Sequence, residues 1–344
     1  MRRTDEERIR DVRRVLDAGR AVYTERARLR GEVARVTGLS PEGVDLGFES
    51  LERDATEAEL RTLVARAGDA PRVHVVLSAN VFVAPLRALA VARAAAPRVT
   101  VRPSSRDPVV ARALVAELAA VGDASFALES ERDVATIAEG EIHVYGRAET
   151  IAAARAAARV VVRAHGPGLG VAVVTGALED AADAVAGDVV PFDQRGCLSP
   201  RVVLVAGEPS RARAFAAALH ERLGAWGGRV PRGELTGEER AEATRWIEAA
   251  RFAGECHVGE DHAVAVAPME GHLGVPPPGR HVVVAAASTP SDAVRRIEPF
   301  APFVVALGTD DVRRVTPLAP ARARLSALGR MQRPPLDGPV DLRC

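Results

Sequence analysis

The sequence predicts an α/β protein with two domains and parallel sheets, and three observations lead to this prediction. Short runs rich in valine, isoleucine and leucine recur between residues 72 and 307. Alanine-rich stretches with helical spacing separate many of these runs. The 344 residues are also enough for about two domains. Short apolar strands that alternate with helices are typical of a parallel sheet covered by helices on both faces.

The chain up to residue 67 predicts helices. Residues 5–36 place apolar side chains at helical spacing and arginines at most other positions. Ser40-Pro41-Glu42 is typical of a cap followed by a proline in the first helical turn. Thr56 and Glu59 form a capping-box pattern for a helix that continues to about residue 67. No chemistry is evident in these helices, so we expect them to serve packing or oligomer contact.

Strands and helices alternate in the next part of the chain. The expected strands are 72–77, 98–102, 125–128, 141–145, 159–163 and 170–174. The expected helices are 85–95, 109–121, 131–138 and 149–158. Sheets of this kind bind ligands at the carboxyl ends of their strands, so polar residues that follow a strand are candidate site residues.

The alternation repeats in the second half of the chain. The expected strands are 202–206, 263–266, 281–285 and 303–307, and the expected helices are 210–224, 236–253 and 291–297. The tail from residue 325 is rich in turn-forming residues. We therefore divide the chain into a first domain, residues 1–190 rejoined by 318–344, and a second domain, residues 191–317.

Composition excludes several classes of function. Basic and acidic residues balance at 46 each and aromatic residues make up 3%, which argues against nucleic-acid and membrane partners. The sequence has no lysine, which excludes Schiff-base chemistry and a Walker-type phosphate loop. The charged N-terminus is not followed by an apolar stretch, and no apolar run is long enough to span a membrane. We expect a cytoplasmic protein.

The three cysteines have neither disulfide nor zinc spacing, but one of them lies in a suggestive place. Cys197 follows Gly196 and precedes a buried strand, a position in which a nucleophilic thiol could lie. A buried structural cysteine is the alternative. Cys256-His257 with nearby acidic residues predicts a polar loop rather than a metal site. The glycine-dense segment 166–170 does not match the dinucleotide fingerprint and predicts a turn between strands.

The order of several short phrases resembles the aldehyde dehydrogenase superfamily. These phrases are a strand followed by Asn80, a strand ending in Arg102-Pro103-Ser104-Ser105, the turn Tyr145-Gly146-Arg147, and a cysteine after Gln194-Arg195-Gly196. The segments 192–200 and 329–338 are similar to the LuxC-type acyl-CoA reductases, the fatty-acid reductase components of bacterial luminescence systems. The resemblance covers about residues 70 to 344. It implies an aldehyde dehydrogenase-like fold, with a Rossmann-like cofactor domain and a catalytic cysteine domain.

The resemblance also implies a reaction. Cys197 would attack an acyl thioester and expel the thiol, and a hydride from a nicotinamide cofactor would then give a thiohemiacetal that collapses to an aldehyde. The attacking species is a thiolate, so we expect a helix N-terminus or an arginine such as Arg195 or Arg201 to lower the pKa of the thiol. Asn80 corresponds to the asparagine that stabilises the oxyanion. A turn residue that ends a strand is the alternative for Asn80.

The cofactor residues implied by the resemblance are Arg102, Ser104 and Gly146. Arg102 takes the place of a lysine that contacts the adenosine ribose, and a guanidinium can hold a 2′-phosphate. NADPH is therefore expected, with NADH possible, although the absence of lysine explains the arginine equally well. Gly146 would line the pyrophosphate region, but the second glycine of the family is not evident.

The resemblance includes one departure that bears on the direction of the reaction. Oxidising members use a glutamate in a Glu-Leu-Gly-Gly phrase to activate water. The corresponding residues, about 164–175, contain no glutamate, and His165 is their one titratable side chain. This fits a reductase, which should not hydrolyse its acyl-enzyme. His165 is interpreted as a turn histidine, with an acid/base role as the alternative.

We therefore expect an acyl-CoA reductase that forms an aldehyde. The alternatives are a CoA-acylating aldehyde dehydrogenase that works in the oxidative direction and a non-catalytic scaffold or acyl-binding relative. The implied partners are acyl-CoA or an acyl-carrier thioester, an acyl-transferring protein, and further copies of the chain in a homo-oligomer. No metal is expected.

Overall fold

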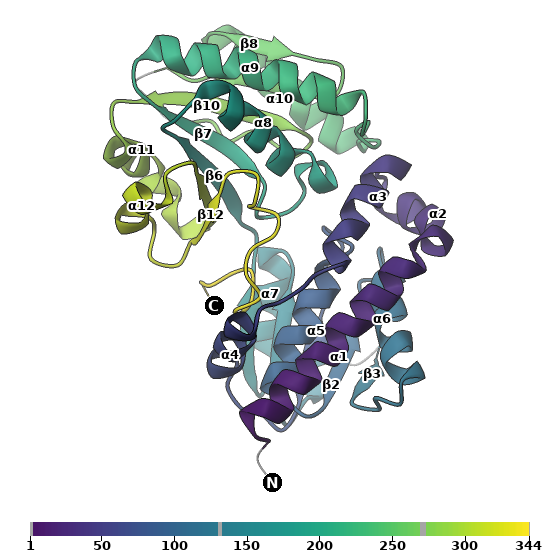
Figure 1. Ribbon diagram of the computed structural model, residues 1–344. Helices are drawn as coiled ribbons and strands as arrows, with labels where there is room; N and C mark the ends of the chain where they lie inside the picture. The colour runs from purple at the N-terminus through teal and green to yellow at the C-terminus, as the bar shows by residue number, and fades with distance from the viewer. Residues whose placement is uncertain (1–2, 130–132, 269–272, 344) are drawn as a thin grey trace. The chain divides into compact units, whose positions relative to one another are not determined.

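The computed structural model describes residues 3–129, 133–268 and 273–343 (Figure 1). The chain forms two compact units, which we call unit 1 and unit 2. Unit 1 contains residues 1–37, 44–167 and 335–344, and unit 2 contains residues 38–43 and 168–334. The sequence predicts boundaries at 190/191 and 317/318 instead, and the second boundary lies at 334/335 in the structure. The first boundary in the structure is at 167/168 because strand β6 (Leu169–Val174) pairs with strands β7 (Pro200–Ala206) and β11 (Val304–Thr309).

Unit 1 is built on a five-stranded parallel sheet. Its strands are β1 (Val73–Val76), β2 (Val99–Arg102), β3 (Phe126–Leu128), β4 (Glu141–Tyr145) and β5 (Val161–His165), in the order β3-β2-β1-β4-β5. The order reverses between β1 and β4, which makes this position a topological switch point of the Rossmann kind. Each strand overlaps the run expected from the sequence, although β5 begins and ends two residues later than the expected strand 159–163.

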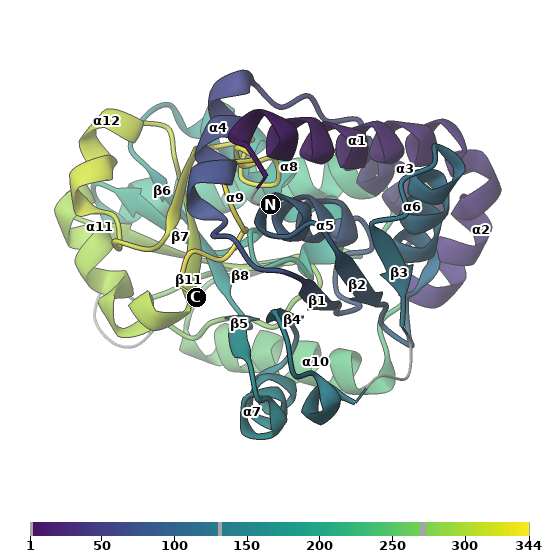
Figure 2. The same ribbon diagram turned by 90° about the horizontal axis from the view of Figure 1, so that it is seen from below.

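Helices cover both faces of this sheet. The helices with residues in unit 1 are α1 (Asp5–Thr24), α2 (Arg26–Thr37), α3 (Pro41–Phe48), α4 (Glu57–Arg66), α5 (Ala84–Ala95), α6 (Val109–Ala120) and α7 (Ala148–Ala157). Figure 2 shows α1, α5 and α6 on one side of the sheet and α7 on the other. Ile151 and Ala154 of α7 pack on Ile142 and Val144 of β4. Each face of the sheet is therefore closed by apolar side chains, as the alternating sequence predicts.

Two of the helices expected in this half differ in the structure. The expected helix 5–36 is two helices, because α1 ends at Thr24 and α2 begins at Arg26. The expected helix 131–138 is only a single 3-10 turn, Val134–Thr136, in which the Asp133 carboxylate accepts from the Ala135 N–H at 3.0 Å. A side chain that bonds its own backbone in this way competes with a regular helix. Residues 130–132 lie outside the described part of the chain.

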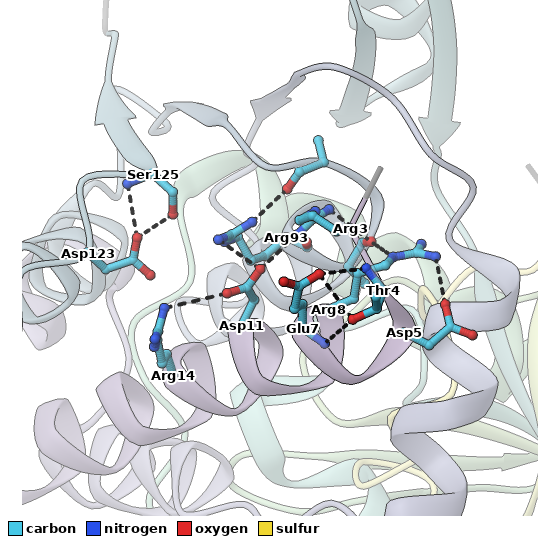
Figure 3. A network of polar contacts seen from close by, with 12 residues as sticks. Arg3, Thr4, Asp5, Glu7, Arg8, Asp11, Arg14, Arg93, Asp123 and Ser125 are labelled. Atoms are coloured by element: carbon cyan, nitrogen blue, oxygen red, sulfur yellow. Dashed lines mark hydrogen bonds and ion pairs between the residues drawn. The ribbon is translucent and has the colours of Figure 1, made fainter. Parts of the chain in front are cut away.

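A network of buried charges fixes helix α1 on helix α5 (Figure 3). The Asp11 carboxylate is 8% exposed and forms ion pairs at 2.9 Å with both Arg3 and Arg93. Arg8 Nε donates to the carbonyl of Ala94 at 2.7 Å. These contacts give α1 the packing role that its amphipathic pattern predicts.

Unit 2 is built on a seven-stranded sheet. The strands besides β6, β7 and β11 are β8 (Cys256–Val258), β9 (Ala263–Val266), β10 (His281–Ala287) and β12 (Arg324–Ala327). The order is β12-β11-β6-β7-β10-β9-β8, and every pairing is parallel except that of β8 with β9. All six residues of β6 are buried, as expected for a strand covered on both faces.

The helices of unit 2 are α8 (Leu178–Val189), α9 (Pro209–Gly227), α10 (Gly237–Ala253), α11 (Pro290–Ile297) and α12 (Val312–Val315). Helices α9, α10 and α11 were expected from the sequence, whereas α8, β8 and β12 were not. In β12, Arg324-Leu325-Ser326-Ala327 contains no β-branched residue, so composition gives no sign of a strand. Among the described residues, no helix is both long enough and apolar enough to cross a membrane.

Candidate active site

The four site residues predicted in unit 1 lie at one edge of its sheet. Asn80 lies in the loop between β1 and α5, Arg102 is the last residue of β2 with Ser104 just beyond it, and Gly146 follows β4. This is the carboxyl edge, where parallel sheets bind ligands. Because β1 and β4 are neighbours at the switch point, the loop of Asn80 and the turn of Gly146 leave the sheet from adjacent strands.

A pocket opens in unit 1 beside Arg102. It is lined by His74, Thr100, Arg102, Glu129, Val134 and Ile137, together with valines of β1. Arg102 is exposed and Glu129 is half-buried, so a charge of each sign borders an apolar surface. Residues of these types could hold part of a nucleotide, since rings pack on apolar atoms and phosphate oxygens need charged partners. Sequence reasoning missed Glu129, although an acidic residue directly after a parallel strand was a possible signal.

The other predicted residues of this edge differ in their surroundings. The Ser104 hydroxyl oxygen accepts from the Arg106 N–H at 3.3 Å, so this side chain shapes its own loop. The Gly146 N–H donates to the carbonyl of His165 at 3.2 Å, which joins the turn after β4 to the end of β5. Asn80 is exposed, which leaves its amide accessible to a ligand.

Cys197 lies in unit 2, at the amino edge of the sheet and not at the carboxyl edge. It is half-buried in a turn that the Ser199 N–H closes by donating to the carbonyl of Gly196 at 3.2 Å. Strand β7 begins at Pro200, so the cysteine is at the amino edge of the unit 2 sheet. Because the chain continues from Cys197 into a turn and a strand, no helix begins at the cysteine to lower the pKa of its thiol. The rule that parallel sheets bind ligands at the carboxyl ends of their strands therefore predicts the candidate residues of unit 1, but it does not predict Cys197.

Glycines of the segment 166–170 pack against the cysteine turn. A Cβ on Gly168 would lie 2.1 Å from Cγ2 of Val305 and 3.2 Å from Cβ of Cys197. A Cβ on Gly170 would lie 2.5 Å from the carbonyl oxygens of both Leu198 and Ser199. The segment connects two strands, as expected, and its glycines also let the backbone approach the cysteine turn closely.

The residues in front of this turn have an unusual backbone. Phe192, Asp193 and Gln194 have φ values of 56°, 49° and 63°, all in the left-handed region. Non-glycine residues pay about 1–2 kcal/mol each for this conformation and adopt it singly as a rule. Three in succession therefore need strong support from the surrounding protein.

The cysteine phrase and the closing phrase 329–338 meet in unit 2. The buried carboxylate of Asp188 accepts from the N–H groups of Gly329 and Met331 at 2.7 and 2.9 Å. Gln332 Nε2 donates to the Ser199 hydroxyl at 2.9 Å and to the Asp188 carbonyl at 2.8 Å. Burial raises the pKa of Asp188 to about 7, although these hydrogen bonds oppose the rise. The closing segment thus supports the residues directly behind Cys197.

The two arginines considered as partners of the thiol have other contacts. Arg195 forms an ion pair with Glu239 at 3.5 Å and a hydrogen bond to the carbonyl of Glu234. Arg201 Nη1 donates to the carbonyl of Pro276 at 3.0 Å, and burial lowers the pKa of this guanidinium. Each of these guanidiniums therefore contributes to holding nearby loops.

The comparisons with known proteins agree with this geometry. Residues 65–333 match the family model described as acyl-CoA reductase (LuxC). The chain belongs to the LuxC family. This LuxC-family protein is an oxidoreductase that reduces an acyl-CoA thioester to an aldehyde with a nicotinamide cofactor. A comparison with curated proteins gave no match.

Solved structures similar to the LuxC-family chain show its fold. An oxidoreductase from Marinobacter aquaeolei is 13% identical, with a TM-score of 0.71, and the match covers 100% of this chain and 84% of that one. A NAD-dependent benzaldehyde dehydrogenase from Corynebacterium glutamicum is 14% identical, with a TM-score of 0.72 and coverage of 94% and 80%. Lactaldehyde dehydrogenase from Escherichia coli is 15% identical, with a TM-score of 0.69 and coverage of 94% and 78%. The predicted aldehyde dehydrogenase-like fold is confirmed.

His165 of the LuxC-family chain is a buried residue at the end of β5. The residue is 7% exposed, and its ring stacks on Tyr145 with centroids 4.3 Å apart. Burial, together with the neighbouring His143, lowers the pKa of His165 to about 3. The imidazole is therefore neutral at physiological pH, which favours a packing role over acid/base chemistry.

The polar cluster around Cys256 forms hydrogen bonds within unit 2. His262 contacts His220 at 2.9 Å and Asp261 at 3.0 Å through its two ring nitrogens. Burial raises the pKa of Cys256. In the described part of the LuxC-family chain, no group of three or more His, Cys, Asp or Glu residues could hold a metal ion. Cys344 lies outside that part.

Proposed function

We propose that this LuxC-family reductase forms its aldehyde through an acyl-enzyme on Cys197. The observation that carries the proposal is the construction around this residue: two close-packed glycines on one side, the Gln332–Ser199 hydrogen bond behind, and a half-buried thiol. The Cys197 thiolate attacks the thioester carbonyl, and the bond to the departing thiol breaks. A bound nicotinamide cofactor supplies the hydride. Collapse of the Cys197 thiohemiacetal then releases the aldehyde and restores the thiolate.

Asn80 is proposed to donate its amide N–H to the oxyanion that forms on the substrate carbonyl. The proposal is supported by the exposed position of Asn80 after β1 and by the family resemblance. Loss of one such donor costs about 10²–10³ in kcat. We therefore expect Asn80→Ala to lower kcat by about 100-fold and to change KM little, measured by cofactor oxidation.

The acyl-enzyme is tested by mass spectrometry of the protein after incubation with acyl-CoA and without cofactor. An acyl adduct on the peptide that contains Cys197 is expected. Cys197→Ala should abolish both the adduct and aldehyde formation, because it removes the proposed acyl acceptor. Cys256→Ala is the matched control and should retain both. An unchanged rate of aldehyde formation in Cys197→Ala would refute the acyl-enzyme.

NADPH is proposed as the cofactor because the exposed Arg102 guanidinium lies at the pocket of unit 1. A guanidinium can bind a 2′-phosphate through two parallel hydrogen bonds. Glu129 at the same pocket favours the competing cofactor, NADH, because a carboxylate accepts from a ribose 2′-hydroxyl and repels a phosphate.

Substitution of Arg102 decides between the two cofactors. If NADPH is the cofactor, Arg102→Gln should lower kcat/KM for NADPH by about 10-fold or more and leave the value for NADH nearly unchanged. Arg98→Gln, which changes an exposed arginine just before the same strand, is the control. Equal effects of Arg102→Gln on both cofactors would rule out a phosphate contact.

The remaining partners are proposed on the family resemblance. They are an acyl-carrier thioester as the alternative to acyl-CoA, an acyl-transferring protein, and further copies of the chain in a cytoplasmic homo-oligomer. Light scattering of the purified protein tests the oligomer, and a single-chain mass would contradict it.

A further inference from the structure

A buried arginine holds the strained segment in front of Cys197. Arg280 is 1% exposed, and its Nε and Nη2 both donate to Oδ1 of Asp193, at 3.0 and 2.8 Å. Its Nη1 donates to the carbonyl of Val230 and to Oδ2 of Asp261, both at 2.8 Å. Every nitrogen of the guanidinium has a partner, so it cannot move away without leaving buried N–H groups unsatisfied.

Asp193 passes this support to the backbone. Its Oδ2 accepts from the Gly233 N–H at 2.9 Å, and its own carbonyl accepts from the Gly279 N–H at 3.1 Å. The carboxylate thus has N–H donors on both oxygens and is itself only 2% exposed. These contacts fix the second of the three left-handed residues from two directions.

Gln194 extends the support toward the cysteine. Its Oε1 accepts from the His281 N–H at 2.9 Å, and its Nε2 donates to the carbonyls of His281 and Pro200, both at 2.9 Å. Pro200 begins strand β7, so the Gln194 side chain links the segment before the Cys197 turn to the strand after it. The Cys197 turn is therefore held at both ends by side chains that are almost fully buried.

We propose that Arg280 is a positioning residue for the acylation of Cys197. The ion pair with Asp193 keeps the left-handed segment folded, and that segment sets the place of the thiol and of the backbone N–H groups beside it. The inference rests on the proposed acyl-enzyme. In the step itself, the Cys197 thiolate bonds to the thioester carbonyl carbon, the bond to the coenzyme A sulfur breaks, and the released thiolate takes a proton from solvent. No electrons are transferred, and Arg280 does not touch the reacting atoms.

Asp193→Asn tests this proposal, with Asp11→Asn as the matched control. Both oxygens of Asp193 accept from N–H groups, so an amide must turn a donor toward a donor. Asp11 is also a buried carboxylate in an arginine ion pair, but it packs helix α1 in unit 1 (Figure 3). A purely structural role predicts that each substitution lowers Tm and leaves the reactivity of the folded thiol unchanged.

Two measurements separate positioning from stability, both made well below the Tm of each variant. The first is the single-turnover rate of acylation by acyl-CoA without cofactor, which should fall about 10- to 100-fold in Asp193→Asn. The second is the pH profile of alkylation of the Cys197 peptide by iodoacetamide, which should change in the same variant. Asp11→Asn should stay within about twofold of the wild type in both.

The proposal is overturned if Asp193→Asn, correctly folded, acylates and alkylates like the wild type. If the Asp193 variant does not fold, Arg280→Lys takes its place, because lysine keeps the charge but loses the two-pronged contact. An unchanged rate in folded Arg280→Lys overturns the proposal equally. Failure of the proposed acyl-enzyme can be told apart from failure of the positioning role. If the acyl-enzyme proposal is wrong, Cys197→Ala still becomes acylated. Alkylation of Cys197 reports on the surroundings of the thiol in either case.

Discussion

His165 shows how burial, together with a neighbouring histidine, decides what a histidine can do. Its ring stacks on Tyr145 inside unit 1, and its pKa lies near 3 instead of the ordinary 6.5. An imidazole with this pKa is uncharged at neutral pH and cannot act there as a general acid through its imidazolium form. We therefore expect the acid limb of the pH–rate profile to come from other groups.

The same pKa predicts how acid affects stability. Between about pH 6.5 and pH 3 the unfolded chain binds one proton at His165 that the folded chain does not, so the free energy of unfolding falls as the pH drops through this range. The contribution is roughly 1.4 kcal/mol for each pH unit. His165→Gln should reduce this loss, measured by urea unfolding at several pH values. His257→Gln is the control, and an equal slope for His165→Gln and wild type would contradict the prediction.

Other single residues show what the sequence could not reveal. Cys197 and Asn80 were predicted from the sequence because each corresponds to a position in the family resemblance, and their roles stay predictions. The roles proposed for Glu129 and Arg280 depend on the fold instead: Glu129 lines the same pocket as Arg102, and Arg280 binds Asp193, 87 residues earlier. In a chain with so many arginines, only the fold shows which of them are buried, Arg280 at 1% exposure among them.

At the scale of elements, β6 packs closely against the cysteine turn because the residues at the contact are glycines. Gly168 and Gly170 lie where the start of β6 passes Cys197, Leu198 and Ser199. A methyl group on Gly170 would meet backbone oxygens, which cannot rotate aside as a flexible side chain would, and one on Gly168 would meet the side chain of Val305. The strand and the turn are therefore spaced by glycine alone.

Gly170→Ala tests this spacing. Because the new Cβ would lie 2.5 Å from two carbonyl oxygens, β6 and the turn must separate, and we expect a loss of about 1–3 kcal/mol of stability. Gly187→Ala in α8 is the control, because nothing lies within 4 Å of its Cβ position. Helix propensity makes that change neutral or stabilising. Urea unfolding measures both, and equal stability of the two variants would show that the turn yields freely.

Periodicity predicted most elements but failed where it is weak. Strands with several valines, such as β1, β7 and β10, lie where they were expected. The short edge strands β8 and β12 were missed because β8 has three residues with a single valine and β12 has no β-branched residue, and pairing with β9 and β11 makes them strands. The expected helix 131–138 shows the converse, since the Asp133 side chain ends the helical pattern with a local hydrogen bond.

At the scale of the whole molecule, each unit contains segments that are distant in sequence. Unit 1 is completed by residues 335–343, which follow all of unit 2. Arg87 donates to the carbonyls of Pro335 and Gly338 at 2.7 and 2.8 Å, and Arg66 forms an ion pair with Asp337 at 3.1 Å. Leu336 is 1% exposed. The last segment is therefore part of the packing of unit 1.

Leu336→Ala should destabilise unit 1. Removal of a buried leucine side chain costs about 2–5 kcal/mol. Hydrogen exchange should show faster exchange in helices α4 and α5 and little change in the strands of unit 2. Val161→Ala, at a residue of the same unit that is 60% exposed, is the control and should leave exchange unchanged. Equal protection in the Leu336 variant would mean that the closing segment adds nothing to unit 1.

The late return of the chain to unit 1 has a consequence for biosynthesis. Residues 335–343 leave the ribosome after every strand of both sheets. Helices α4 and α5 therefore lack their contacts with this segment while unit 2 is being synthesised. Unit 2 consists of the continuous stretch 168–334 and of residues 38–43, which are synthesised earlier. The nascent chain can therefore finish unit 2 first, and proteases that act during synthesis should cut unit 1 more readily than unit 2.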